Sequence, residues 1–158
     1  MATTDIIKAS PRPVHGAHGP AAAILRRWPT AAGIAASTAA LLVFFPLPHL
    51  WKVDLSAWSV LLAAVIYFTW GAARGDLSHR RFLTAQTAAV LGFGALAVIA
   101  ATITPEPARY LLAAGWLAHG TWDAVHHHIG RVVPRYYAEA CLACDVVFAA
   151  GLLATGGL

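Results

Sequence analysis

The stretch FLTAQTAAVLGFGALAVIAATITP, residues 82–105, decides the fold class, because its 24 residues include no Asp, Glu, Lys or Arg. An α-helix rises about 1.5 Å per residue, so roughly 20 apolar residues cross the hydrocarbon core of a bilayer. Two other stretches, residues 28–50 and 55–73, are equally free of these charged side chains. The sequence therefore predicts at least three transmembrane helices.

The composition of the whole chain agrees with a membrane protein. Of its 158 residues, 59% are hydrophobic and only 11% are charged, whereas soluble domains carry roughly a quarter charged residues. We predict an all-α polytopic membrane protein. Its helices are also rich in small residues, as in TAAGIAASTAA at 30–40, and small residues let helix backbones approach closely in lipid.

Two more spans are predicted in the last third of the chain, although each contains an aspartate. Residues 110–122 give only thirteen uncharged positions before Asp123, which is too short to cross, so the span must include that residue. Asp145 likewise interrupts the apolar run of residues 140–158. The prediction is a bundle of five transmembrane helices, with spans at about 29–49, 56–73, 82–103, 108–127 and 136–156.

The basic residues predict the orientation of this bundle, since Lys and Arg near span ends collect on the cytoplasmic side. Under the five-span topology nine of the eleven lie on one side: Lys8, Arg12, Arg26, Arg27, Arg74, Arg80, Arg81, Arg131 and Arg135. Only Lys52 and Arg109 lie on the other. We therefore expect a cytoplasmic N-terminus and an outside C-terminus in a bacterial-type inner membrane. The net charge of +4 is then explained by a basic cytoplasmic rim that faces anionic membrane lipid, and no binding of nucleic acid is expected.

The domain organisation is expected to be simple. Residues 1–24 are rich in Pro, Gly and Ala without an apolar period, which is typical of a flexible tail, here cytoplasmic. His15 and His18 in this tail are expected to be solvated. Residues 25–158 are predicted to form a single transmembrane helical domain.

The polar chemistry of the chain is concentrated in AHGTWDAVHHH, residues 118–128. At 100° per residue, one face of a helix carries His119, Asp123, His126 and His127. Helices joined by a short loop are usually antiparallel neighbours. The next helix should therefore bring Asp145 beside His119. Its Glu139 should lie toward the cytoplasmic end of the row of polar side chains between the two helices, which we call the polar ladder.

Ionisable groups at this depth are costly, so they normally face the bundle interior and pair with one another. One interpretation is a metal or acid/base site, with metal-ligand candidates His119, Asp123, His126, His127 and Glu139 and catalytic candidates His119, Asp123 and Asp145. Mixed imidazole and carboxylate ligation suits iron, zinc, copper or manganese. The protein would then be an enzyme acting on a lipid or an isoprenoid.

The alternatives require no catalysis. The same ladder would serve as a relay in a proton or metal carrier, for which a homo-oligomer would supply the missing outer path. It would also serve as a helix lock in an assembly subunit, with a hydrogen bond between His119 and Asp145 fixing the register. Cys141 and Cys144 form a CxxC, but small apolar filler is the expected role of buried free cysteine.

At His119 and the HHH of residues 126–128, the chain resembles the histidine boxes of integral-membrane fatty acid hydroxylases and desaturases. The resemblance implies dioxygen-dependent oxidation of a lipid acyl chain at a diiron centre on the cytoplasmic face. That family spreads its box histidines over several segments, whereas here only His79 would supplement this helix, so a single metal ion is expected. Residues 116–145 are also similar to uncharacterised small bacterial membrane proteins, which implies no activity.

Overall fold

The computed structural model describes residues 26–44 and 46–154, which form five α-helices, one short 3-10 helix and no strand. The all-α prediction is confirmed for this part of the chain. Residues 1–24, predicted as a tail, and the end of the last predicted span lie outside it. The elements are α2 (Trp28–Phe44), α3 (His49–Ala73), η1 (Asp76–Ser78), α4 (Arg80–Thr102), α5 (Pro105–Ile129) and α6 (Arg135–Ala154).

The first two helices differ from the predicted spans at their shared boundary. α2 ends at Phe44 and α3 already begins at His49, where residues 29–49 and 56–73 were expected. Pro46 and Pro48 have no backbone N–H for a helix interior, so the chain turns there, and Pro48 becomes the N-cap of α3. The charged Lys52 lies in the first turn of α3.

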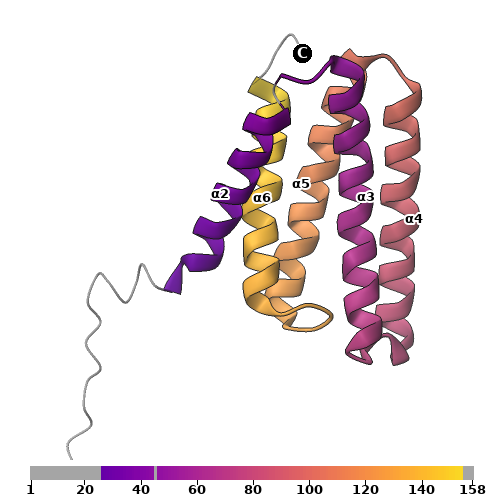
Figure 1. The fold of residues 1–158 in the computed structure, drawn as a ribbon. Coiled ribbons are helices and arrows are strands. Elements are labelled where there is room, and N and C mark those ends of the chain that lie inside the picture. Colours follow the sequence, from indigo (N-terminus) through magenta and orange to yellow (C-terminus); the bar gives the residue numbers. More distant parts are fainter. Residues whose placement is uncertain (1–25, 45, 155–158) are drawn as a thin grey trace, which may run out of the picture.

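α5 is the central helix of the bundle. It packs against α3, α4 and α6, while α2 packs against α6 (Figure 1). Ten residues of α5 are buried, among them His119 and Asp123. Two prolines in its first turns and a left-handed Gly130 just after Ile129 define its ends, as is usual for helix N- and C-termini. The polar stretch of the sequence is thereby placed inside the bundle.

α2 and α6 approach each other closely at Gly33. A Cβ built on this glycine would overlap the carbonyl oxygen of Ala140, so no larger residue fits without moving a helix. The Cys144 thiol donates a hydrogen bond of 3.1 Å to the Gly33 carbonyl. Cys144 therefore has a packing role between the two helices, as expected for a small buried residue.

Three helices are long and apolar enough to cross a membrane: Trp51–Ala73, Arg80–Thr102 and Arg135–Ala154. α2 is apolar but only 17 residues long, and α5 carries most of the buried polar groups. Large apolar side chains such as Leu42, Leu62 and Leu91 are exposed on the surface, which suits contact with lipid. The fold is thus consistent with a membrane protein, while the five-span topology and its orientation stay predictions.

The basic residues of the described chain gather at one end of the bundle, which we call the basic end. The start of α2, the turn between α3 and α4 and the loop between α5 and α6 lie at this end (Figure 1). These segments carry Arg26, Arg27, Arg74, Arg80, Arg81, Arg131 and Arg135. Lys52 and Arg109 belong to the first turns of α3 and α5, at the opposite end.

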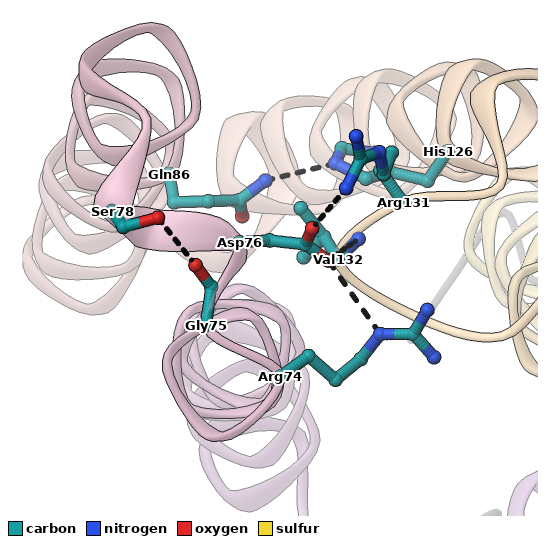
Figure 2. Close-up of polar contacts among 8 residues, drawn as sticks. All are labelled: Arg74, Gly75, Asp76, Ser78, Gln86, His126, Arg131 and Val132. Atoms are coloured by element: carbon teal, nitrogen blue, oxygen red, sulfur yellow. Dashed lines mark hydrogen bonds and ion pairs between the residues drawn. The ribbon is translucent and has the colours of Figure 1, made fainter.

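Asp76 ties two of these segments together (Figure 2). Its carboxylate accepts hydrogen bonds of 2.9 Å from the Arg131 guanidinium and 2.9 Å from the Val132 backbone N–H, and Arg74 lies 3.5 Å away. Val132 has a φ of 70°, a conformation that β-branched residues rarely adopt and that needs such support. The turn after α3 thus holds the loop that joins α5 to α6.

Candidate metal centre

α5 and α6 supply the three residues of a buried triad, His119, Asp123 and Asp145. His119 and Asp123 are four residues apart on α5 and so lie on one face. α6 comes close because Gly120 has no side chain: a Cβ there would lie 3.3 Å from the Cβ of Asp145. The glycine between the two α5 residues therefore lets the carboxylate of α6 reach them.

The atoms of the triad meet around one imidazole nitrogen. His119 Nδ1 lies 2.8 Å from Asp145 Oδ2 and 3.5 Å from Asp123 Oδ1. One ligand atom from each residue can be chosen so that all three lie within 4.8 Å of one another, and all three residues are buried. The predicted contact of His119 with Asp145 is confirmed, and the three predicted catalytic residues form a group that can hold a metal ion.

Buried polar atoms without a hydrogen-bond partner are concentrated around this triad. Within the described residues there are seven, and six belong to neighbouring side chains: Tyr67 Oη, Gln86 Oε1, His119 Nε2, Trp122 Nε1, Asp123 Oδ1 and Asp123 Oδ2. Native proteins leave few such atoms, and each one indicates strain, a function or a bound species. The environment of the triad is therefore suited to an additional polar species, such as an ion or water.

Tyr67 of α3 is the site residue that sequence reasoning missed. Its ring packs edge-on against His119, with centroids 5.5 Å apart, and against His126, at 5.1 Å. It lies in an apolar helix with no polar neighbour in sequence, and its role depends on how α3 packs against α5. Its one local signal was a hydroxyl in the middle of a predicted span.

His126 joins the site to α4 (Figure 2). Its Nδ1–H donates to the Trp122 carbonyl at 2.8 Å, so its Nε2 accepts the hydrogen bond of 2.8 Å from the Gln86 amide. Both ring nitrogens are thus engaged, and in this structure His126 lies next to the triad without being one of its ligands. Gln86 therefore links α4 to α5 through this histidine.

The other two predicted metal ligands lie apart from the triad. His127 Nδ1 donates to the Arg135 carbonyl at 3.0 Å, and Glu139 accepts a hydrogen bond from the Thr30 hydroxyl of α2. Both side chains line a separate pocket between α2, α5 and α6. In the structure the group around His119 therefore contains the carboxylates of Asp123 and Asp145. Metal ligation by His127 and Glu139 stays a prediction.

Outside the membrane-spanning segments, Asp76 shows how the fold treats a buried carboxylate. Burial alone would raise its pKa, but the Val132 N–H and the Arg131 and Arg74 guanidinium groups outweigh burial and hold the pKa below its ordinary value. This aspartate is therefore a charged structural residue at neutral pH. The carboxylates of the triad contact the His119 imidazole, and no Arg or Lys of the described residues forms an ion pair with them.

No protein-family model matches the chain, and no curated protein or solved structure shows significant similarity to it. These comparisons do not bear on the resemblance to histidine-box membrane enzymes, and a function for the chain depends on the chemistry of the site itself.

Proposed function

We propose that this protein is a polytopic membrane protein that binds one divalent transition-metal ion through His119, Asp123 and Asp145. The observation that carries the proposal is Asp123. Its side chain is 0% exposed, and neither of its oxygens makes a hydrogen bond of good geometry. Its polar neighbours are the Tyr67 hydroxyl, the Asp145 carboxyl and the His119 imidazole, which already contacts Asp145. A cation between these groups would satisfy the free oxygens.

The charge of the site supports a cation. Two carboxylates buried together in an apolar bundle repel each other and lose their hydration, which is costly unless they are compensated. A divalent ion compensates both at once, and imidazole plus carboxylate suits iron, zinc, copper or manganese. The proposal is thus a site with three protein ligands, a number that leaves a coordination position for water or substrate.

The geometry needs only small movements to load such an ion. Ligand atoms at about 2.1 Å from a tetrahedral ion lie about 3.4 Å apart, while the triad's atoms lie within 4.8 Å of one another. Side-chain rotations that shift the carboxylate oxygens by about 1 Å would close the difference. The hydrogen bond from His119 to Asp145 would give way to shared coordination.

The finer proposal is an enzyme acting on a lipid acyl chain or an isoprenoid. The metal would polarise water or an oxygen substrate at the open position, and the Asp123 or Asp145 carboxylate would move a proton. The membrane surroundings support an apolar substrate. We place the basic end in the cytoplasm of a bacterial-type cell, with five spans and with lipid as the first partner; reporter fusions after residues 76, 104 and 132 test this topology.

Elemental analysis of the detergent-purified full chain, with His15→Ala and His18→Ala to remove tail ligands, tests the metal site. We expect close to one transition-metal ion per chain, lost in the His119→Ala, Asp123→Ala double variant. The exposed His128 supplies the control, since His128→Ala should keep the ion. His127→Ala and Glu139→Ala measure whether these two residues contribute. Full metal retention in the double variant would overturn the site.

A second function is favoured by the short contact of 2.8 Å between His119 and Asp145. Such a pair is suited to hold a proton in a relay, or to lock α5 against α6. In that case neither the wild type nor the double variant binds metal, and His119→Ala lowers the stability of the fold. A proton carrier differs from a lock because proteoliposomes containing the wild type would then show a proton flux that His119→Ala abolishes.

A further inference from the structure

A second cavity lies away from the triad, between α2 and α3 toward the end opposite the basic end. Its volume is about 350 Å³, and its walls come from α2, α3, α5 and α6, within the size range of ligand pockets. Consecutive helices usually pack together, but here α2 packs on α6 while α3 packs on α4 and α5. The pocket occupies the resulting opening.

The walls of this pocket change from buried to lipid-facing along its depth. Trp116 of α5, which lines its inner part, is 4% exposed, while Leu42 of α2 at its rim is 72% exposed. Leu41 and Phe148 add further apolar wall. Because Leu42 faces the surface on which lipid would lie, the pocket opens sideways into the bilayer.

The polar groups of the pocket lie mainly on α3. Lys52 is in the first turn of the helix, and Ser56 and Ser59 follow on the wall. Ser56 accepts a hydrogen bond of 2.9 Å from the Trp116 indole N–H. At about 1.5 Å per residue, Lys52 lies roughly 10 Å nearer the helix end than Ser59, so the cationic group is at the membrane boundary and the apolar part extends inward.

We propose that this pocket binds one acyl chain of an anionic phospholipid, with the lipid phosphate at Lys52. The apolar walls fit a hydrocarbon chain, and the lysine ammonium complements the negative headgroup at the depth where headgroups lie. Lys52 is the cation on the pocket wall. This binding goes beyond the metal site and does not depend on it.

Photolabelling tests the proposal on the wild-type chain in lipid nanodiscs. The probes are phosphatidylglycerol and phosphatidylcholine, each with a diazirine midway along one acyl chain, and labelled residues are mapped by mass spectrometry. We expect Leu41 and Phe148 to be labelled about fivefold more by the anionic probe, the effect of one basic residue near a headgroup. The exposed Leu91 of α4 should be labelled equally by both.

Two variants separate the headgroup from the chain. Lys52→Gln should remove the preference for phosphatidylglycerol, and Lys52→Arg should keep it. Ser59→Phe fills the pocket and should suppress labelling of Leu41 and Phe148 by both probes, while Leu91 stays labelled. The wild-type comparison decides the question even if a variant does not fold.

Two results would overturn the proposal: pocket residues labelled no more than Leu91, or labelled equally by the anionic and neutral probes. Metal content, measured on the same samples, should be the same in wild type and Lys52→Gln. A failed lipid site with bound metal, and a bound lipid without metal, are therefore distinct outcomes for the two proposals.

Discussion

Two buried aspartates of this protein have opposite surroundings. Asp76, near the basic end, accepts hydrogen bonds from the Val132 N–H and the Arg131 side chain (Figure 2). At Asp123, in the bundle interior, neither oxygen makes a hydrogen bond of good geometry within the described residues, and the polar neighbours are the Tyr67 hydroxyl, His119 and Asp145. A carboxylate whose two oxygens both accept hydrogen bonds from the protein has a structural role. A carboxylate that is equally buried, but whose oxygens make no well-formed hydrogen bond, is a candidate for binding an ion or water.

The largest expected effect separates the two aspartates by metal affinity. Asp123→Asn removes one charged ligand, so we expect the affinity for the ion to fall by more than about a hundredfold. Even the mutation of a residue that only hydrogen-bonds to a ligand lowers metal affinity by about 10- to 100-fold. The stability of the metal-free protein should stay equal or rise, because a neutral amide is easier to bury than an unpaired charge. Competition with a chelating dye measures the affinity.

Asp54→Asn is the matched control, since Asp54 is exposed near the start of α3 and far from the triad in sequence; it should leave the affinity unchanged. If Asp123→Asn bound the ion as tightly as the wild type, Asp123 would not be a ligand. If it strongly destabilised the metal-free protein, Asp123 would resemble Asp76 and the contrast between them would disappear.

Asp76→Ala should have the opposite pair of effects. It leaves the buried Val132 N–H without an acceptor at a backbone angle that needs support, and we expect a loss of about 2 kcal/mol of unfolding free energy. Unfolding in mixed detergent and SDS micelles measures it, with Asp54→Ala as the control. Metal affinity should change little in the folded fraction, because neither Asp76 nor any of the groups that contact it belongs to the triad. An unchanged unfolding free energy would show that the tie is not structural.

The sequence predicted the contact between α5 and α6 but not the contacts that surround it. Helical spacing and a short loop between antiparallel helices were enough to bring His119 to Asp145. Tyr67 reaches the triad only through the register of α3 against α5, which no local pattern records.

The other candidates show the same limit. Helical spacing predicted that His127 and Glu139 lie near the loop between α5 and α6. Their hydrogen-bond partners, however, are the Arg135 carbonyl at the start of α6 and a hydroxyl of α2. Those partners depend on how the α5–α6 loop closes and on where α2 packs. Periodicity predicts which face a side chain occupies, whereas the competing partner is set by tertiary packing.

Tyr67→Phe sharpens the contrast with a smaller change. The Tyr67 hydroxyl is buried beside Asp123 and makes no hydrogen bond of good geometry, so its removal should alter the stability of the metal-free protein by less than about 1 kcal/mol. If the hydroxyl orients a metal-bound water or a carboxylate when the ion is present, metal affinity should fall by about tenfold. Calorimetric titration with the metal, and unfolding without it, measure the two quantities separately.

Tyr137→Phe is the matched control, because Tyr137 packs against Tyr67 on the same side of the bundle and carries the same hydroxyl. It should leave metal affinity within about twofold of the wild type, well below the effect expected of a group that supports a ligand. Equal losses in both variants would mean that the effect is not specific to the Tyr67 hydroxyl.

The smallest expected effect is the acid dependence of the tie at Asp76. The pKa of Asp76 is lower in the folded protein than its value of about 3.9 in an unfolded chain. Its stabilisation is therefore complete above about pH 4 and is lost as the pH falls through the folded pKa. The difference in unfolding free energy between wild type and Asp76→Asn should be constant near neutral pH and shrink below about pH 4.

This effect should be smaller than that of Asp76→Ala, because Arg74 and Arg131 are 40% and 50% exposed and water screens their attraction. Asparagine also keeps an acceptor for the Val132 N–H, so the variant isolates the charge. A difference that grew as the pH fell would mean that the carboxyl is favoured in its protonated form. Asp76 would then not be the charged, fully partnered aspartate against which Asp123 stands out.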